Sequence, residues 1–132
     1  MSLYQHELFT LNLNKVISVF QPDPDEGTVI IQTDDQRKIE VATDSPQSAA
    51  ELLTEFAAQW EAAVGPLLRH GQYVLLTSAI YSIQAQGNEV FIYFRDHSVS
   101  FAMADEFQAA GLLGDLTRRW QMALGLAVPE AE

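Results

Sequence analysis

Residues 52–65 read LLTEFAAQWEAAVG, and residues 112–125 read LLGDLTRRWQMALG. Both stretches begin with paired leucines and end in Trp-x-x-Ala-x-Gly. Their apolar residues recur at the spacing of one helix face, and the final glycine suits a left-handed helix end. Asp44-Ser45-Pro46 and the pair Asp105 and Gln108 supply helix starts upstream. Each stretch therefore predicts an amphipathic helix, and the two helices are copies of one another.

The similarity continues upstream of both helices. Residues 29–33 (VIIQT) align with 90–94 (VFIYF), and residues 14–20 (NKVISVF) align with 78–84 (SAIYSIQ). Further back, LFTLNL at 8–13 aligns with QYVLLT at 72–77. A unit that recurs in this way buries its apolar face by packing on its copy. The sequence therefore predicts a single domain over 1–132, built of two repeats at about 8–65 and 72–125.

The segments before each helix are predicted to be strands. Residues 8–13 alternate apolar and polar side chains, and 29–33 and 39–41 are rich in β-branched residues. Residues 22–27 and 34–36 carry the Asp, Pro and Gly typical of turns. The predicted fold class is α+β with a pseudo-two-fold internal repeat, in which each unit is an antiparallel meander of three to four strands followed by one helix.

Composition narrows the chemistry that the chain can carry. The chain has no cysteine, so disulfides, thiolate nucleophiles and cysteine-based metal sites are excluded. The net charge of −11 disfavours nucleic acid as a partner, and the seven basic residues are scattered. No segment has the length and apolar character of a membrane span, and the N-terminus does not look like a signal peptide, so we expect a cytoplasmic protein that contacts no membrane.

Neither a metal site nor a cofactor is predicted. The three histidines stand apart from one another in the sequence, and the acidic turn 23–27 does not have the register of a calcium loop. Sequence patterns of catalytic nucleophiles and of phosphate-binding or dinucleotide-binding loops are absent. An enzyme remains possible only as one of an unrecognised type.

Two features mark a candidate interaction surface. Gly111 and Gly114 lie within the second predicted helix, where they disfavour the helix or allow another backbone to come close. The strand at 90–94 has large apolar side chains on both faces, so it is either central in its sheet or covered by a partner. The candidate surface consists of Tyr81, Phe91, Tyr93, Arg95, Gly111 and Gly114.

These features lead to three functional hypotheses. The first is a non-catalytic binding or assembly module, a homodimer or a protein that binds another protein. The second is a single-stranded nucleic-acid-binding protein, in which Tyr81, Phe91 and Tyr93 stack on bases while Arg37, Lys38 and Arg95 contact phosphates. The order of strands and helix is similar to that of the Whirly and Pur-type folds, although no sequence motif is shared. The third is the enzyme of unrecognised type.

Overall fold

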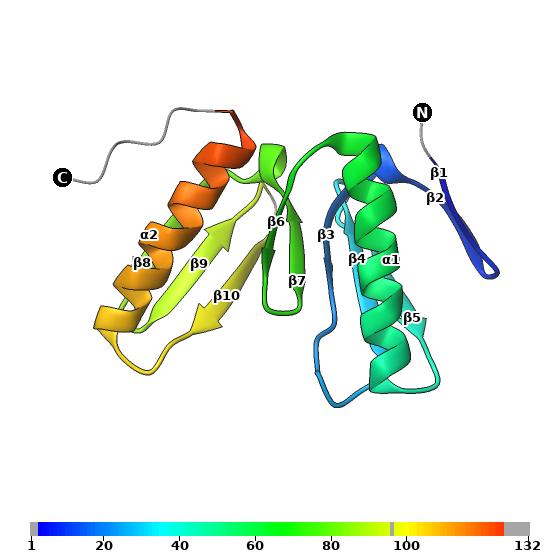
Figure 1. The fold of residues 1–132 in the computed structure, drawn as a ribbon, viewed down its shortest axis with the longest axis horizontal. Helices are drawn as coiled ribbons and strands as arrows, with labels where there is room; N and C mark the ends of the chain where they lie inside the picture. The colour runs from blue at the N-terminus through cyan, green and yellow to red at the C-terminus, as the bar shows by residue number, and fades with distance from the viewer. Residues whose placement is uncertain (1–2, 96, 126–132) are drawn as a thin grey trace. The chain divides into compact units, whose positions relative to one another are not determined.

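The computed structural model describes residues 3–95 and 97–125 and consists of strands and two α-helices (Figure 1). The elements of the first repeat are β1 (Leu3–His6), β2 (Phe9–Asn12), the 3₁₀ turn η1 (Leu13–Lys15), β3 (Val16–Phe20), β4 (Thr28–Thr33), β5 (Lys38–Ala42) and α1 (Pro46–Val64). Those of the second are β6 (Leu67–His70), β7 (Tyr73–Leu76), η2 (Thr77–Ala79), β8 (Ser82–Gln86), β9 (Glu89–Tyr93), β10 (Ser98–Ala102) and α2 (Glu106–Ala123). The predicted α+β class and the repeated order of strands before a helix are confirmed.

Each repeat opens with a short β-hairpin that is built in the same register. Leu3 pairs with Asn12 and His6 with Phe9 in β1–β2. In β6–β7, Leu67 pairs with Leu76 and His70 with Tyr73. The repeated element order thus begins at β1 and β6, a few residues ahead of the limits suggested by the sequence alignment, and it has five strands per repeat where three to four were expected.

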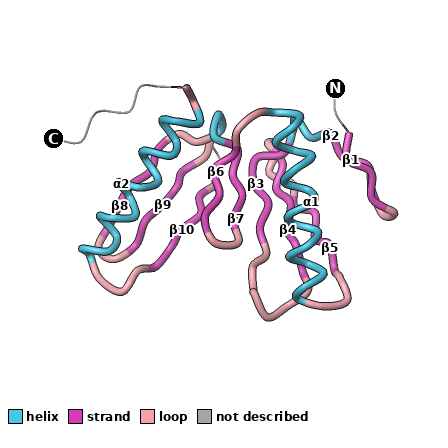
Figure 2. Tube along the Cα trace, in the orientation of Figure 1, coloured by secondary structure: helices cyan, strands magenta, loops and turns pink. Residues whose placement is uncertain are grey.

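The strands form three antiparallel sheets, and their membership crosses the boundary between the repeats. The orders are β5-β4-β3-β7-β6, β10-β9-β8 and β1-β2. The hairpin β6–β7 of the second repeat therefore lies in the sheet of the first, against β3 (Figure 2). The chain divides into two compact units, 1–76 and 77–132. That the whole chain is one domain stays a prediction.

In the first unit, helix α1 covers one face of the five-stranded sheet (Figure 1). The Ser45 hydroxyl accepts a hydrogen bond from the Ser48 amide at 3.1 Å, and proline occupies the first turn, as the sequence indicated. Gly65 ends the helix at a φ of 96°, which favours glycine. The core includes Phe56 and Trp60 of the helix together with apolar residues of β3, β4 and β5.

In the second unit, α2 packs on the three-stranded sheet. The Asp105 carboxylate accepts from the Gln108 amide at 2.8 Å and so caps the helix. Val90 and Ile92 of β9 are fully buried, as is Leu116 of α2. Strand alternation places Val90 and Ile92 on the same face of the sheet, which is the face toward the helix.

Candidate functional site

The aromatic side chains of β9 lie on the face of its sheet that α2 leaves open. Successive strand residues point to opposite faces, so Phe91 and Tyr93 point away from the helix that buries Val90 and Ile92. The two rings stack with centroids 5.9 Å apart and planes at 18°. β9 is the central strand of its sheet, which is one of the two arrangements that its sequence allowed.

Uncharged residues flank this aromatic pair on both neighbouring strands. Tyr93 lies between Ser82 of β8 and Ser98 of β10. Phe91 lies between Gln84 and Ser100 in the same way. We call this surface the aromatic face and define it by Phe91, Tyr93, Ser82, Gln84, Ser98 and Ser100. It presents two half-buried rings that are flanked across the strands by small or neutral polar groups, with Glu89 on the same face at one end.

Tyr81 and Arg95 lie at one end of the same sheet. The Tyr81 amide donates to the Tyr93 carbonyl at 2.8 Å, and the Tyr81 side chain is 70% exposed. Arg95 is exposed in the turn after β9, where the Phe94 amide donates to the His97 carbonyl. The four predicted residues Tyr81, Phe91, Tyr93 and Arg95 thus belong to one sheet of one unit. Asp96, which aligned with Asp35 in the sequence, lies outside the described residues.

Gly111 and Gly114 belong to a different surface. Both are exposed on α2, whose buried Ala109, Leu112 and Leu116 face the sheet. A Cβ atom added at either glycine would meet no atom within 4 Å among the described residues. Nothing in this part of the chain approaches the two glycines closely, so both interpretations, a close approach by another backbone and a cost to the helix alone, stay open for them.

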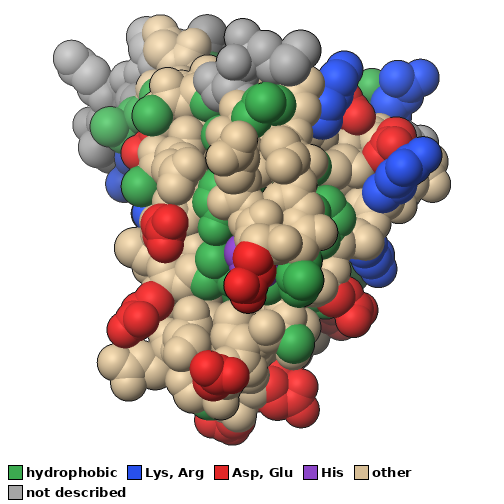
Figure 3. All heavy atoms as spheres, turned by 90° about the vertical axis from the view of Figure 1, so that its right-hand side faces the viewer, with side chains coloured by type: hydrophobic (Ala, Val, Ile, Leu, Met, Phe, Trp, Pro, Cys, Tyr) green, Lys and Arg blue, Asp and Glu red, His purple; other side chains and the backbone are tan. Residues whose placement is uncertain are grey.

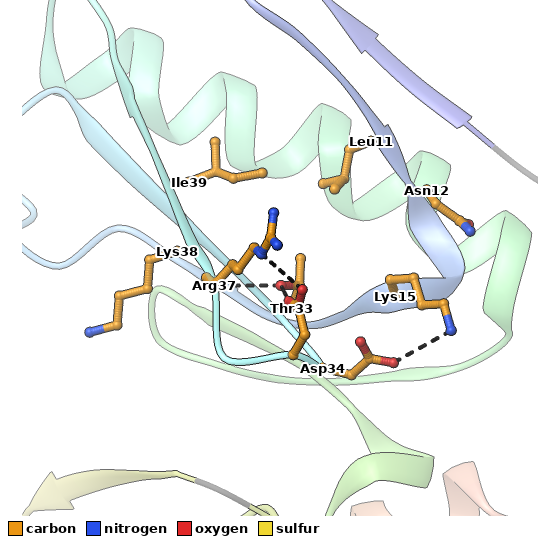
Figure 4. Close-up of a pocket in the computed structure, with 9 residues that line it drawn as sticks. Leu11, Asn12, Lys15, Thr33, Asp34, Arg37, Lys38 and Ile39 are labelled. Atoms are coloured by element: carbon orange, nitrogen blue, oxygen red, sulfur yellow. Dashed lines mark hydrogen bonds and ion pairs between the residues drawn. The ribbon is translucent and has the colours of Figure 1, made fainter.

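The first unit has a hollow of about 570 Å³ between β2, η1 and the β4–β5 turn (Figure 4). Its lining residues are Leu11, Asn12, Lys15, Thr33, Asp34, Asp35, Arg37, Lys38 and Ile39. The charged groups pair with one another: Lys15 lies 3.8 Å from Asp34, and Arg37 lies 3.0 Å from Asp35. The side chain of Lys38 extends away from the others in Figure 4.

The pKa of Asp35 in this hollow is lowered from its ordinary value. The hydroxyl of Thr33 donates a short hydrogen bond to its carboxylate and lowers the pKa, and the backbone and charge of Arg37 add to this effect. Asp35 is therefore a carboxylate near neutral pH and accepts hydrogen bonds without offering a proton. Arg37 and Lys38, predicted as phosphate contacts, belong to this unit, and Arg37 is engaged with Asp35.

Four of the basic side chains form ion pairs with carboxylates: Lys15 with Asp34, Arg37 with Asp35, Arg69 with Glu61 and Arg119 with Asp115. In the view of Figure 3, Lys and Arg gather along one border beside Asp and Glu, and most of the remaining charged groups on that face are acidic. Within residues 3–95 and 97–125, no three His, Asp or Glu side chains come together as a metal ion requires. Neither α1 nor α2 has the length and apolar character of a membrane-spanning helix.

The sequence alignment paired β2 with β7 through residues 8–13 and 72–77, but it missed the first strand of each leading hairpin, β1 and β6. LYQH at 3–6 and LLRH at 67–70 share their first and last residues, a signal too short to stand out before the pairing register was known. For this reason the sequence did not show that the hairpin β6–β7 pairs with the edge of β3, or that no described strand pairs with the edge of β8. A comparison of the chain with protein-family models, with curated proteins and with solved structures finds no match in any of the three.

Proposed function

We propose that this chain is a non-catalytic assembly module that forms a homodimer through the sheet of its second unit. The observation that carries the proposal is the aromatic face, with stacked Phe91 and Tyr93 flanked on both neighbouring strands by uncharged residues. The buried centres of protein interfaces are enriched in aromatic residues and depleted of charge. The aromatic face has this composition.

The charge of the chain also favours this surface for contact between two copies. Each copy has a net charge of −11, so like copies repel one another at long range. Contact is least opposed where a face has few carboxylates, because a buried unpaired charge is costly, and the aromatic face has Glu89 only at its end, two residues before Phe91. The three serines and Gln84 beside the rings provide hydrogen-bonding groups without charge.

Light scattering after size-exclusion chromatography at micromolar concentration tests this proposal. We expect twice the chain mass of 14.7 kDa for the wild type. Phe91→Lys should weaken the dimer because it places a charge in the middle of the aromatic face. The matched control is Ile30→Lys at the corresponding position of β4, where Glu40 lies directly across on β5. A strictly monomeric wild type would contradict the proposal.

Single-stranded nucleic acid is the second candidate ligand, and the same pair of rings favours it. Two aromatic side chains on alternate residues of a central antiparallel strand form a platform on which bases can stack. Tyr81 is exposed at the end of this platform, just before β8, and Arg95 is exposed in the turn that follows β9. The net charge of −11 opposes this reading, so we rank it below assembly.

Fluorescence anisotropy with a short oligothymidylate distinguishes the two candidates. If bases stack on the aromatic face, Phe91→Ala and Tyr93→Ala should each weaken binding by about tenfold, since one stacking contact contributes about 1–3 kcal/mol. Phe107→Ala is the control, because Phe107 is 88% exposed but lies on α2. Absence of binding at low salt, where phosphate contacts are strongest, would eliminate this candidate.

A further inference from the structure

Among the described residues, β2 and β8 each have an edge that no other strand covers and that lacks the usual protection of strand edges. β8 is an edge of the three-stranded sheet, and β2 pairs only with β1. Neither SIQAQ nor FTLN contains a charged residue or proline, the features that normally keep strand edges from pairing. The edge strand β5 has such protection in Lys38 and Glu40. β10 is an uncharged edge strand as well. The correspondence between the two repeats shows which of β8 and β10 has a covered counterpart in the first unit.

The first unit shows how the edge that corresponds to β8 is covered. There β7 pairs with β3, with Leu75 opposite Ser18 and Tyr73 opposite Phe20. The rings of Tyr73 and Phe20 stack at 4.9 Å. Beyond this ladder the Gln21 amide donates to the Gln72 carbonyl at 3.2 Å. The edge of β3 is thus occupied by the leading hairpin of the other repeat.

The repeat assigns the same positions to β8 and to the first hairpin. β8 corresponds to β3, with Ser82 at the position of Ser18, and β1–β2 corresponds to β6–β7 in the same pairing register. β10 corresponds to β5, which is a free edge in the first unit. The edge to be covered in the second unit is therefore β8, and the hairpin that fits it is β1–β2.

The side chains of the first hairpin are more exposed than their counterparts. Leu8 at its tip is 78% exposed, whereas the corresponding Gln72 contacts Gln21. Leu3 is 50% exposed, whereas Leu67 is 9% exposed. Exposed leucines at these positions are expected of a hairpin whose pairing partner is absent.

We propose that the hairpin β1–β2 of one copy pairs with β8 of a second copy, and that the exchange is reciprocal. This inference rests on the proposed homodimer and specifies its contact. By correspondence with the first unit, Leu11 lies opposite Ser82 of the second copy, Thr10 opposite Ile83, and Phe9 opposite Gln84. Reciprocal exchange closes the assembly with two-fold symmetry and leaves neither β8 edge open.

The exchange also enlarges the aromatic face. Gln84 and Ser82 pair with Phe91 and Tyr93 inside the three-stranded sheet. Phe9 and Leu11 of the incoming hairpin continue these two rows, because directly opposite residues of antiparallel strands share a face. Edge pairing and the aromatic face thus belong to one interface.

Cysteine cross-linking tests the register, because the chain has no cysteine of its own. The Gln21–Gln72 hydrogen bond and the alternation of antiparallel ladders make Ser18–Leu75 a non-hydrogen-bonded pair. Leu11 and Ser82 inherit this geometry, whose Cα separation of about 4.5 Å suits a disulfide. A mixture of Leu11→Cys and Ser82→Cys chains should therefore give disulfide-linked dimers on mild oxidation. Leu11→Cys mixed with Ser98→Cys, at the opposite end of the same row, should give none.

A proline substitution tests the contribution of the edge to affinity. By the same alternation the Thr10 amide points away from β1, and its side chain is exposed, so Thr10→Pro leaves the hairpin ladder and its packing intact. We expect the dimer dissociation constant to rise about tenfold or more. Glu40→Pro is the matched control on β5, where the Thr33–Arg37 hydrogen bond sets the Glu40 amide outward from β4.

The outcomes separate this inference from the proposed function. A dimer that responds to Phe91→Lys but gives no Leu11–Ser82 cross-link would overturn the exchange and leave the homodimer standing. A cross-link to Ser98 would assign the contact to β10. A cross-link formed only within one Leu11→Cys, Ser82→Cys chain would mean that the hairpin covers its own β8. A monomer at all concentrations tested would reject both proposals.

Discussion

The two repeated tryptophans occupy corresponding positions in different environments. Trp60 is fully buried in the core of the first unit, and its indole N–H has no hydrogen-bond partner among the described residues. Trp120 is half-buried, and its indole N–H donates to the Thr77 carbonyl at 3.0 Å. The repeat places both tryptophans at the same position of the two helices, which by itself predicts equal roles for them. The structure gives Trp60 the larger share of apolar burial and Trp120 the hydrogen bond.

We therefore expect unequal losses of stability from the two alanine substitutions. Trp60→Ala removes a fully buried side chain and should lower the free energy of unfolding by about 3–5 kcal/mol. Trp120→Ala should cost less, since the Trp120 side chain is only partly buried, although the Thr77 carbonyl loses its donor. Urea unfolding followed by circular dichroism measures both. Equal losses, or a larger loss at Trp120, would contradict this ranking.

The hydrogen bond from Thr33 to Asp35 leads to a second prediction about a single residue, which concerns the pKa of Asp35. The pKa of Asp35 is lowered first by the Thr33 hydroxyl. Its contribution to stability is therefore present above the ordinary carboxyl pKa and is lost as the pH falls through the lowered value. Thr33→Val should raise the pKa of Asp35, which carboxyl carbon NMR measures directly. An unchanged titration would show that Arg37, rather than Thr33, stabilises the carboxylate.

At the scale of elements, the hairpin β1–β2 is attached to its own unit mainly by side chains. Tyr4 is buried and meets the Phe56 ring edge-on at 4.7 Å. Among the strands of residues 3–95 and 97–125, β1 and β2 pair with each other and with no further strand. A hairpin that is held by side-chain packing keeps a free backbone edge, which is what the proposed exchange requires.

Packing of Tyr4 predicts a loss of stability at alkaline pH. Burial, and secondarily the charge of Glu55, raise the pKa of Tyr4 above its ordinary value of 10.0. The folded state keeps a proton that the unfolded state loses, so stability is complete below pH 10 and falls as the pH rises toward the higher, folded pKa. Tyr4→Phe should make this fall shallower, and Tyr81→Phe, an exposed control, should not. Thermal unfolding between pH 8 and 11 measures the difference.

At the scale of the whole molecule, the first sheet needs residues from both repeats. A chain that ends at residue 66 keeps β1 to α1 but loses β6 and β7, which uncovers the edge of β3 and removes Leu67 and Val74 from the core. A chain that ends at residue 76 keeps the complete sheet. The boundary between the compact units, and not the boundary between the repeats, is therefore the place to divide the chain.

We expect fragment 1–76 to fold and fragment 1–66 to remain unfolded or to aggregate. Dividing the chain after residue 66 separates β3, β4 and β5 from β6 and β7, so neither 1–66 nor 67–132 has the complete five-stranded sheet. The free energy of unfolding of a unit of this size is small. Hydrogen exchange at the β3 amides measures the outcome, with protection in 1–76 and none in 1–66. Equal protection in both fragments would mean that β6–β7 contributes little to the first unit.

The sequence by itself determined the elements of this protein and their order. Helical periodicity and capping residues located α1 and α2, and alternation and turn residues located most strands, because these signals are local. The grouping of Tyr81, Phe91, Tyr93 and Arg95 was foreseeable for the same reason, since they lie close together along the chain. The pairing of Arg37 with Asp35 was not foreseen, although Asp35 lies in the predicted turn 34–36 and Arg37 directly follows it.

Only the tertiary structure decided which strands pair between the repeats. Alternation fixes the face that a strand buries but not the neighbour whose backbone it meets, since every strand offers the same N–H and C=O groups. The choice of β3 as the partner of β7 depends on contacts far apart in sequence. The pairing of β7 with β3 covers the edge of β3 and leaves the corresponding edge of β8 uncovered among the described residues. The hairpin of either repeat offers the same backbone groups, so the local sequence does not determine which sheet the hairpin completes.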